Sequence, residues 1–204
     1  MALWGKGSER RGTPSDFLVI GLGNPGAEYA RSRHNVGFEV IEELARRGGT
    51  RLAASKLKAS TVEAQLAGKR LALACPTTYM NLSGESAVLL VRRYGIESAE
   101  QIIVVQDELD LPPGVVRVKA GGGLAGHNGL RSLTQHLHTQ DYLRVRIGVG
   151  KPPSKDAGVS HVLKKIPKAE RSLLDVAVQV AADAVESIAA NGVGPTMTDF
   201  NGRA

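Results

Sequence analysis

The chain has 204 residues, of which 42% are hydrophobic and 23% charged, and its formal net charge is +6. This composition excludes an intrinsically disordered protein, and the length predicts one globular domain with a sizeable core. The single cysteine, Cys75, excludes an intrachain disulfide and favours a reducing, cytoplasmic location. No apolar run approaches the roughly 20 residues of a membrane span.

Residues 1–15 are basic and have no apolar segment typical of a secretory signal. We expect a flexible basic tail over 1–15 and one folded domain over 16–204. Positive charge is concentrated in residues 144–171, which hold eight Lys or Arg against Asp156 and Glu170. Such a block suggests a polyanionic partner, most often nucleic acid, although a solvated surface stretch would have the same composition.

Hydrophobic periodicity along the chain predicts strands and helices in alternation. Strands are expected at 17–21, 56–66, 69–74, 101–106, 114–120 and 143–148, and helices at 35–47, 81–94, 128–138 and 167–191. This order predicts a single-domain three-layer α/β/α sandwich around a twisted mixed β-sheet. In the last helix we expect Leu173, Leu174 and Val176 to belong to one apolar face. Residues 151–166, rich in Lys, Pro and Ser, are expected to form a mobile lid.

The segment Gly21–Gly26 matches the G-x-G-x-x-G pattern of dinucleotide-binding proteins and follows the first expected strand. That pattern requires a helix to open within the glycines, so that its N-terminal amides meet a pyrophosphate. Here Pro25 lies in the turn, and helical periodicity begins only near Asn35. We therefore expect these glycines to serve a tight turn that presents Asn24 and brings His34 into a crevice.

Four polar loops follow expected strands, and in open α/β sheets ligands bind beyond the carboxyl ends of strands. If all four loops face one crevice, that crevice holds His34, Asp107 and the side chains of Asn24, Asn81 and Asn128. The loops span residues 24–35, 76–81, 107–114 and 121–129.

This set of side chains has the groups that water activation requires. A neutral histidine can take a proton from water, and a carboxylate on its other ring nitrogen fixes the tautomer. An asparagine amide can donate to a developing oxyanion. A G-x-S-x-G nucleophile elbow does not occur in the sequence, which favours direct attack by water.

Each group also has a simpler interpretation. His34 could be a structural histidine, and residues 107–110 could be ordinary turn and cap chemistry or a metal site. His136 and His138 form an isolated H-x-H pair without companion ligands. The glycines 121–123 could cradle a phosphate, but they lack the Gly-Lys-Ser/Thr ending of a P-loop.

Five segments, in order, resemble bacterial-type peptidyl-tRNA hydrolases, and the resemblance extends from about Phe17 to Asn201. The segments are GLGNPGAEYARSRHNVG, PTTYMNLSGES, DELDLPPG, GGGLAGHNGLRSL and RVRIGVGKP. The resemblance implies hydrolysis of the ester between a peptide and the 3′-terminal ribose of tRNA, which recycles tRNA after premature drop-off from ribosomes. It also implies an enzyme that needs no metal and no cofactor. We expect a monomer, as is usual for a small hydrolase with a single site.

The resemblance also implies roles for individual residues. His34 would be the general base and Asp107 its partner, while Asn81 would hold the water or polarise the ester carbonyl. Asn24 would separate blocked from free aminoacyl ends. The remaining implied contacts are Tyr29, Tyr79 and Asn128 to the 3′ end and the peptide, and Lys119 and Arg146 to the 5′-phosphate.

The sequence departs from the family pattern at Ala125, which replaces a usual glycine, and at Gln106, where the family varies. Neither removes an implied catalytic residue. Two other functions remain to be tested: a non-catalytic RNA-binding paralogue on the same scaffold, and a nucleotide-dependent oxidoreductase based on the glycine pattern.

Overall fold

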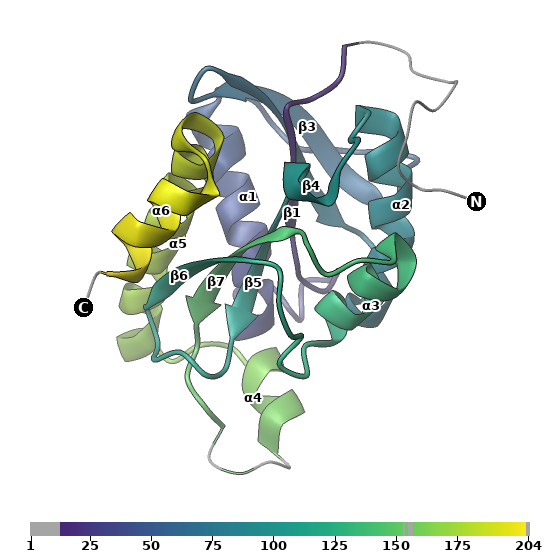
Figure 1. Ribbon diagram of the computed structural model, residues 1–204. Coiled ribbons are helices and arrows are strands. Elements are labelled where there is room, and N and C mark those ends of the chain that lie inside the picture. The colour runs from purple at the N-terminus through teal and green to yellow at the C-terminus, as the bar shows by residue number, and fades with distance from the viewer. Residues whose placement is uncertain (1–12, 153, 155–156, 203–204) are drawn as a thin grey trace.

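The structure of the chain is a computed structural model that describes residues 13–152, 154 and 157–202. Within these residues seven strands form one mixed sheet in the order β2-β3-β4-β1-β5-β7-β6 (Figure 1). The strands are β1 (Phe17–Gly21), β2 (Ala53–Ala54), β3 (Ala59–Leu66), β4 (Lys69–Pro76), β5 (Ile102–Glu108), β6 (Val116–Ala120) and β7 (Leu143–Gly148).

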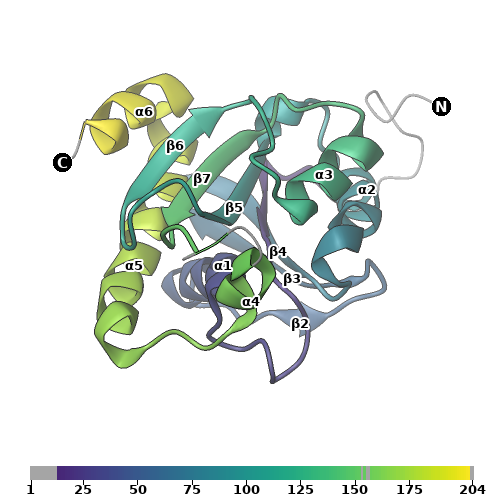
Figure 2. The ribbon, with the colours of Figure 1, turned by 90° about the horizontal axis from the view of Figure 1, so that it is seen from below.

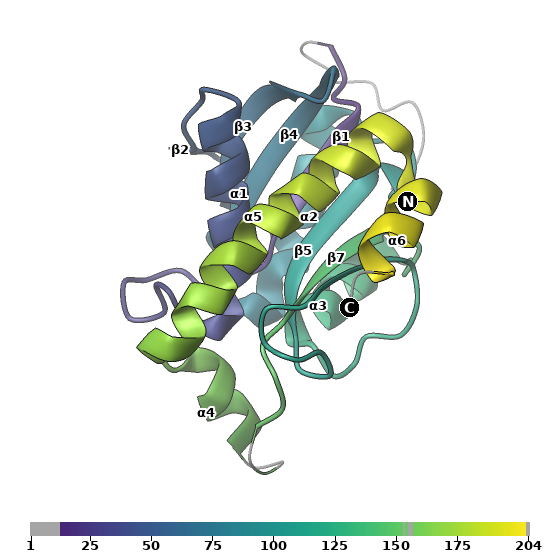
Figure 3. The ribbon, with the colours of Figure 1, turned by 90° about the vertical axis from the view of Figure 1, so that its left-hand side faces the viewer.

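Helices cover both faces of this sheet, which confirms the expected three-layer α/β/α sandwich. Figure 3 shows α5 running diagonally across one face with α1 beside it, and α2 and α3 cover the opposite face. The helices are α1 (Val36–Arg47), α2 (Ser83–Tyr94), α3 (Asn128–Leu137), α4 (Gly158–Leu163), α5 (Lys168–Asn191) and α6 (Val193–Asn201). Short 3-10 turns are η1 (Arg33–Asn35), η2 (Met80–Leu82) and η3 (Ala99–Gln101).

The period-two alternation of the strands divides the core into two layers. In β1, Val19 packs with α1 and α5, while Leu18 and Ile20 pack with α2 and α3. All three side chains are fully buried. Strands buried on both faces are continuous apolar runs, and this is why the central strands were identifiable in the sequence.

Strand direction determines which loops meet. The strands β4, β1, β5 and β7 are parallel to one another, so their carboxyl ends lie at one edge of the sheet. Figure 2, seen from that edge, shows α4 in front of the strand ends. The strand β6 is antiparallel to β7, so its carboxyl end lies at the opposite edge. Only three of the four expected loops therefore begin at the common edge.

Several elements differ from the sequence-based expectation. The strand β2 and the helices α4 and α6 were not predicted, because they are short or lack a strong apolar period. In α5 the expectation for Leu173 and Val176 was wrong: they are 53% and 63% exposed, while Leu174 and Ala177 are buried. Apolar residues three apart can thus belong to the outer side of a helix whose buried face is wide and rich in alanine.

The ends of the expected domain and lid lie partly outside the described residues. Residues 1–12 of the expected tail are not described, whereas Ser15 is buried and donates its backbone N–H to Tyr94 O at 3.0 Å. In the expected lid, residues 153, 155 and 156 are not described, and α4 occupies its centre. Among the described residues, no helix is long and apolar enough to cross a membrane.

Candidate functional site

The glycines of the G-x-G-x-x-G segment allow α1 to pack closely on the end of β1. A Cβ on Gly21 would lie 2.3 Å from Gly37 O, and a Cβ on Gly23 would lie 2.7 Å from the Phe38 ring. Only Gly26, with φ of 110°, serves the turn conformation that we expected of all three. The next helical element after these glycines is η1, which begins at Arg33, so no helix N-terminus is available to a pyrophosphate at this position.

The η1 turn holds His34 because its flanking residues are anchored to other elements. Asn35 makes a two-point bond with the backbone of Asn24: its Oδ1 accepts from Asn24 N and its Nδ2 donates to Asn24 O, both at 2.9 Å. Arg33 is buried against residues that follow β7. This turn therefore presents the His34 imidazole to β5 with little freedom.

The carboxylate of Asp107 lies at the centre of the site. One oxygen, Oδ1, is 2.8 Å from His34 Nδ1 and 3.1 Å from His127 Nε2. Burial opposes ionisation of this carboxyl group, but the two imidazoles outweigh burial and hold the pKa of Asp107 well below its usual range. Asp107 is therefore an ionised acceptor, and both facing ring nitrogens carry a proton.

His127 is a site residue that sequence reasoning missed. It is the N-cap of α3, and its Nδ1 accepts from the backbone N–H groups of Gly129 and Leu130. Because Nδ1 accepts, the single ring proton of neutral His127 is on Nε2, which donates to Asp107. Its position directly before the expected helix at 128–138 could have indicated an N-cap. It was overlooked because histidine is not among the residues usually preferred as N-caps.

The same bonds determine the tautomer of His34. Its Nδ1–H donates to Asp107, so in the neutral ring Nε2 has a lone pair available to a ligand. His34, Asp107, His127 and Asn128 line a common cavity of about 230 Å³. Its other walls are Gln106, Glu108, Leu109 and, from α4 and its surroundings, Gly158, Val159 and Val162. His34, whose Nε2 is not used by Asp107, is therefore part of the wall of this cavity.

Of the three expected asparagines, Asn128 lines this cavity, whereas Asn24 and Asn81 are not part of its wall, and the three differ in exposure. Asn24 is buried, and its Oδ1 accepts from Met80 N at 2.8 Å, which connects the first loop to the residue before Asn81. Asn81 itself is exposed. Asn128 is exposed too, and its Oδ1 accepts from Arg131 at 2.9 Å. The side-chain oxygens of Asn24 and Asn128 thus each accept a hydrogen bond within the protein, and these bonds orient the Nδ2 donors of the two residues.

Close packing brings the second and fourth loops together. A Cβ on Gly129 would lie 2.5 Å from Met80 Sδ and 3.1 Å from His127 Cε1. Only a glycine at this position lets Met80 pack against the start of α3. Asn81 and Asn128, which follow Met80 and His127, are thereby brought to the same region.

The fourth loop begins at the far edge of the sheet and crosses its face to reach the site. Arg144 on β7 is 2% exposed, and its guanidinium donates to Gly122 O and to Gly123 O. Its charge also lies 4.9 Å from the centre of the Tyr142 ring. Within the loop Ala125 has φ of 47°, a left-handed conformation that the glycine usual in this position would adopt at lower cost.

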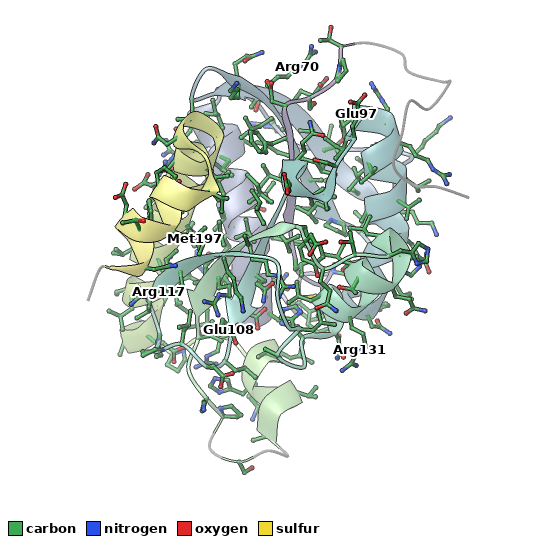
Figure 4. All side chains as sticks on the ribbon, in the orientation of Figure 1. Arg70, Glu97, Glu108, Arg117, Arg131 and Met197 are labelled. Carbon is green, nitrogen blue, oxygen red and sulfur yellow. The ribbon has the colours of Figure 1, made fainter. Side chains whose placement is uncertain are left out.

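The expected phosphate-binding pair lies on one face of β6 and β7. Lys119 is paired with Arg144, and Arg117 with Arg146, so Lys119 and Arg146 are diagonal neighbours. Arg146 is 3.6 Å from Glu108, which Figure 4 labels near the lower end of the sheet. Arg117 lies near α6 (Figure 4), where it donates to Phe200 O.

Other expected residues lie outside the cavity wall. Tyr79 is 57% exposed, and Tyr29 is partly buried in the loop before η1. The basic block of residues 144–171 does not form one exposed surface, because Arg144 is buried and Arg171 is paired with Glu39 and Asp175. The charge pattern alone therefore overstated the polyanion-binding surface. Cys75 is buried, and burial raises the pKa of its thiol.

His34, Asp107 and His127 also have the residue types of a metal site, with atoms within 4.8 Å of one another. The α3 cap argues against a metal at this position. A metal ion on His127 Nε2 would displace the ring proton while Nδ1 still accepts from the helix, which requires an imidazolate. The cluster is better suited to holding protons than to holding a cation.

A histidine held by a buried carboxylate, at the carboxyl edge of a three-layer α/β sheet, is suited to take a proton from water, as a hydrolase requires. Comparison with known proteins gives the family. The model of the peptidyl-tRNA hydrolase family matches residues 18–204, so the chain belongs to that family.

Individual relatives agree with the family match. The chain is 52% identical over 170 residues to the peptidyl-tRNA hydrolase of Nocardia farcinica, covering 83% of this chain and 88% of that protein. It is 46% identical over 185 residues to that of Frankia alni, covering 91% and 93%. The crystal structure of peptidyl-tRNA hydrolase from Acinetobacter baumannii is 41% identical, with a TM-score of 0.86, over 94% of this chain and 98% of that one.

Proposed function

We propose that this chain hydrolyses the ester between a peptide and the 3′-terminal ribose of tRNA, with His34 as the general base. The observation that supports this most is the bond from His34 Nδ1 to the ionised Asp107, which leaves Nε2 as a proton acceptor in the cavity. The family match supplies the substrate class. We place this reaction in the cytoplasm, where translation takes place. We also propose that the protein acts as a monomer, because one chain contains all the groups that the reaction requires.

The proposed reaction needs only the residues of this site. His34 Nε2 takes a proton from a water molecule as the water oxygen attacks the ester carbonyl carbon, and Asp107 stabilises the resulting imidazolium. The exposed Asn81 donates from Nδ2 to the oxyanion of the tetrahedral intermediate. The intermediate then breaks its bond to the ribose oxygen, which receives the proton from His34, and free tRNA and peptide leave.

Asn24 is suited to separate blocked from free aminoacyl ends. Its Oδ1 already accepts from Met80 N, so the group that it can offer to a substrate is the Nδ2 donor. A donor is complementary to the carbonyl oxygen of a peptide or acetyl group. It is not complementary to the ammonium of a free aminoacyl end, which only donates. This selectivity therefore depends on the orientation that the Met80 bond imposes.

The rest of the proposed interface serves the tRNA. Lys119 and Arg146 are proposed to hold the 5′-phosphate. Their position on one face of β6 and β7 supports this role, because an ammonium and a guanidinium provide charge without reading sequence. Tyr29, Tyr79 and Asn128 are proposed to contact the 3′ end and the peptide. His127 is an addition to this set, as a positioning residue that acts through Asp107.

The test compares two substrates, N-acetyl-aminoacyl-tRNA and free aminoacyl-tRNA, each with and without EDTA. We expect release of tRNA only from the blocked substrate, at the same rate in EDTA, because the proposed reaction requires no metal. Binding of tRNA without release from either substrate would favour the non-catalytic RNA-binding alternative. Loss of activity in EDTA would contradict the metal-independent mechanism.

A further inference from the structure

Arg33, the residue before His34, is buried by a set of bonds that the proposed reaction does not use. It is 6% exposed, and its guanidinium makes two parallel bonds to Glu170, from Nε at 2.8 Å and from Nη2 at 2.6 Å. Its Nη1 donates to His161 O at 3.0 Å. The turn η1, which holds His34, is called the catalytic turn below. One of its side chains, that of Arg33, is thus bonded both to α4 and to the first turn of α5.

Two further contacts connect the same segments. Ser32, the residue before Arg33, forms an isolated antiparallel bridge with Lys165. His161 in turn makes a bond of 3.2 Å from Nε2 to Val149 O, directly after β7. The segment of residues 157–170 is therefore bonded to the end of β7 through His161, and to Ser32 and Arg33 through His161, Lys165 and Glu170.

This segment is also a wall of the catalytic cavity. Val159 and Val162 of α4 line the same cavity as His34 and Asp107. Val159 is 68% exposed, so its side chain is available to whatever occupies the cavity. A ligand that pushes α4 outward or draws it inward acts directly on the residues to which Arg33 is bonded.

We propose that Arg33 is a positioning residue that couples the place of α4 to the alignment of His34 on Asp107. The proposal rests on the hydrolytic function proposed above. Asp107 is held by β5 and by His127, so it does not follow α4. His34 is one residue from Arg33 on a three-residue turn, so a displacement of Arg33 changes the bond from His34 Nδ1 to Asp107.

A second ion pair offers a matched control. Arg171, one residue after Glu170, makes two bonds to Glu39, at 3.1 Å and 2.7 Å, and attaches α5 to α1. Its side chain is 12% exposed, against 7% for Arg33. The two pairs share their chemistry and their place on α5, but only the Arg33 pair belongs to the catalytic turn.

The test separates positioning from stability by removing both charges of each pair. Replacing both partners of a buried pair by apolar residues is often neutral for stability, whereas removing one leaves an uncompensated charge. We therefore compare R33M/E170M with R171M/E39M. Melting temperatures of the two double variants should be close to wild type, and those of the single variants R33M and R171M should be lower.

With N-acetyl-aminoacyl-tRNA, R33M/E170M should lose about 10- to 100-fold in kcat with KM within about twofold, because misplacement of a catalytic group affects the chemical step. R171M/E39M should keep kcat within about twofold. Wild-type kcat in R33M/E170M would overturn the proposal, and so would an equal loss in both double variants.

A spectroscopic readout keeps this test independent of turnover. In imidazole proton NMR, the His34 Nδ1–H resonance should be downfield in wild type and in R171M/E39M, because this proton is bonded to Asp107. It should move upfield or exchange away in R33M/E170M. An unchanged resonance in R33M/E170M would overturn the proposal about Arg33, whether or not the wild-type protein hydrolyses the substrate. Absence of hydrolysis by the wild-type protein would instead refute the proposed function.

Discussion

At the residue scale, the site depends on one atom, Asp107 Oδ1, which accepts from two histidines. An ionised carboxylate oxygen can accept hydrogen bonds from both ring N–H groups, and this leaves Nε2 of His34 and Nδ1 of His127 without a proton. These two unprotonated nitrogens have different tasks. That of His34 opens on the cavity, whereas that of His127 caps α3, so helix formation and the charge state of the site are coupled.

Two substitutions at His127 separate these tasks. Asparagine can cap a helix but cannot extend to Asp107 as the imidazole does, whereas alanine does neither. We expect both H127N and H127A to lower kcat about tenfold, because a hydrogen bond to a charged group contributes about 1.5 kcal/mol or more. H127A should also lose about 1 kcal/mol of unfolding free energy relative to H127N.

These values are measured by steady-state kinetics on blocked aminoacyl-tRNA and by urea unfolding. Equal stability of the two variants would show that the cap contributes little. Full activity in H127N would show that Asp107 orients His34 without the second histidine.

At the element scale, α1 is held on α5 by a network centred on Glu43, which is 8% exposed. Glu43 accepts from Arg46 and Arg47, and Arg47 also bonds to Asp183 and Glu186 of α5. The bond from Arg46 is the main reason that the pKa of Glu43 is lowered to about 2, although burial opposes it.

The lowered pKa predicts a pH-dependent contribution to stability. A group whose pKa is lowered by folding stabilises the protein above its unfolded pKa, here about 4.5, and this contribution is lost as the pH falls toward about 2. E43Q should therefore reduce the unfolding free energy by up to about 3 kcal/mol at pH 7, and the difference from wild type should shrink between pH 5 and pH 3.

Urea unfolding at several pH values measures this difference. The neighbouring E42Q is the control, because Glu42 is exposed and its loss should change the unfolding free energy by less than about 0.5 kcal/mol. A difference between E43Q and wild type that stays constant down to pH 3 would contradict the assignment.

At the scale of the whole molecule, the sequence predicted the three layers of the fold better than the direction of its edge strand and the course of the loop that follows it. The central strands were evident because Ile102 to Val105 form an unbroken apolar run that only a strand buried on both faces explains. The direction of β6 was not evident, because an alternating strand such as Val116–Ala120 has the same pattern in either orientation. The path of the glycine loop across the sheet follows from that direction.

The site was predictable to the extent that the polar loops expected after the strands contain its residues. His34, Asp107 and Asn128 do line one cavity, whereas Asn24 and Asn81 are not part of its wall. The bonds of Arg33 to Glu170 and of His127 to Asp107 join residues 137 and 20 positions apart, and local sequence contains no sign of either. Arg144 was interpreted as surface charge, although it is buried and donates to a backbone carbonyl group. Composition does not reveal which arginine side chains form such bonds.

The central claim, that His34 Nε2 is the base of a peptidyl-tRNA esterase, is tested most directly by turnover of N-acetyl-aminoacyl-tRNA by H34A. We expect kcat to fall by about 10²- to 10⁴-fold, the usual contribution of a general base. The affinity for tRNA should stay within about twofold, because the proposed phosphate contacts, Lys119 and Arg146, are unchanged. A rate near that of wild type in H34A would contradict the claim.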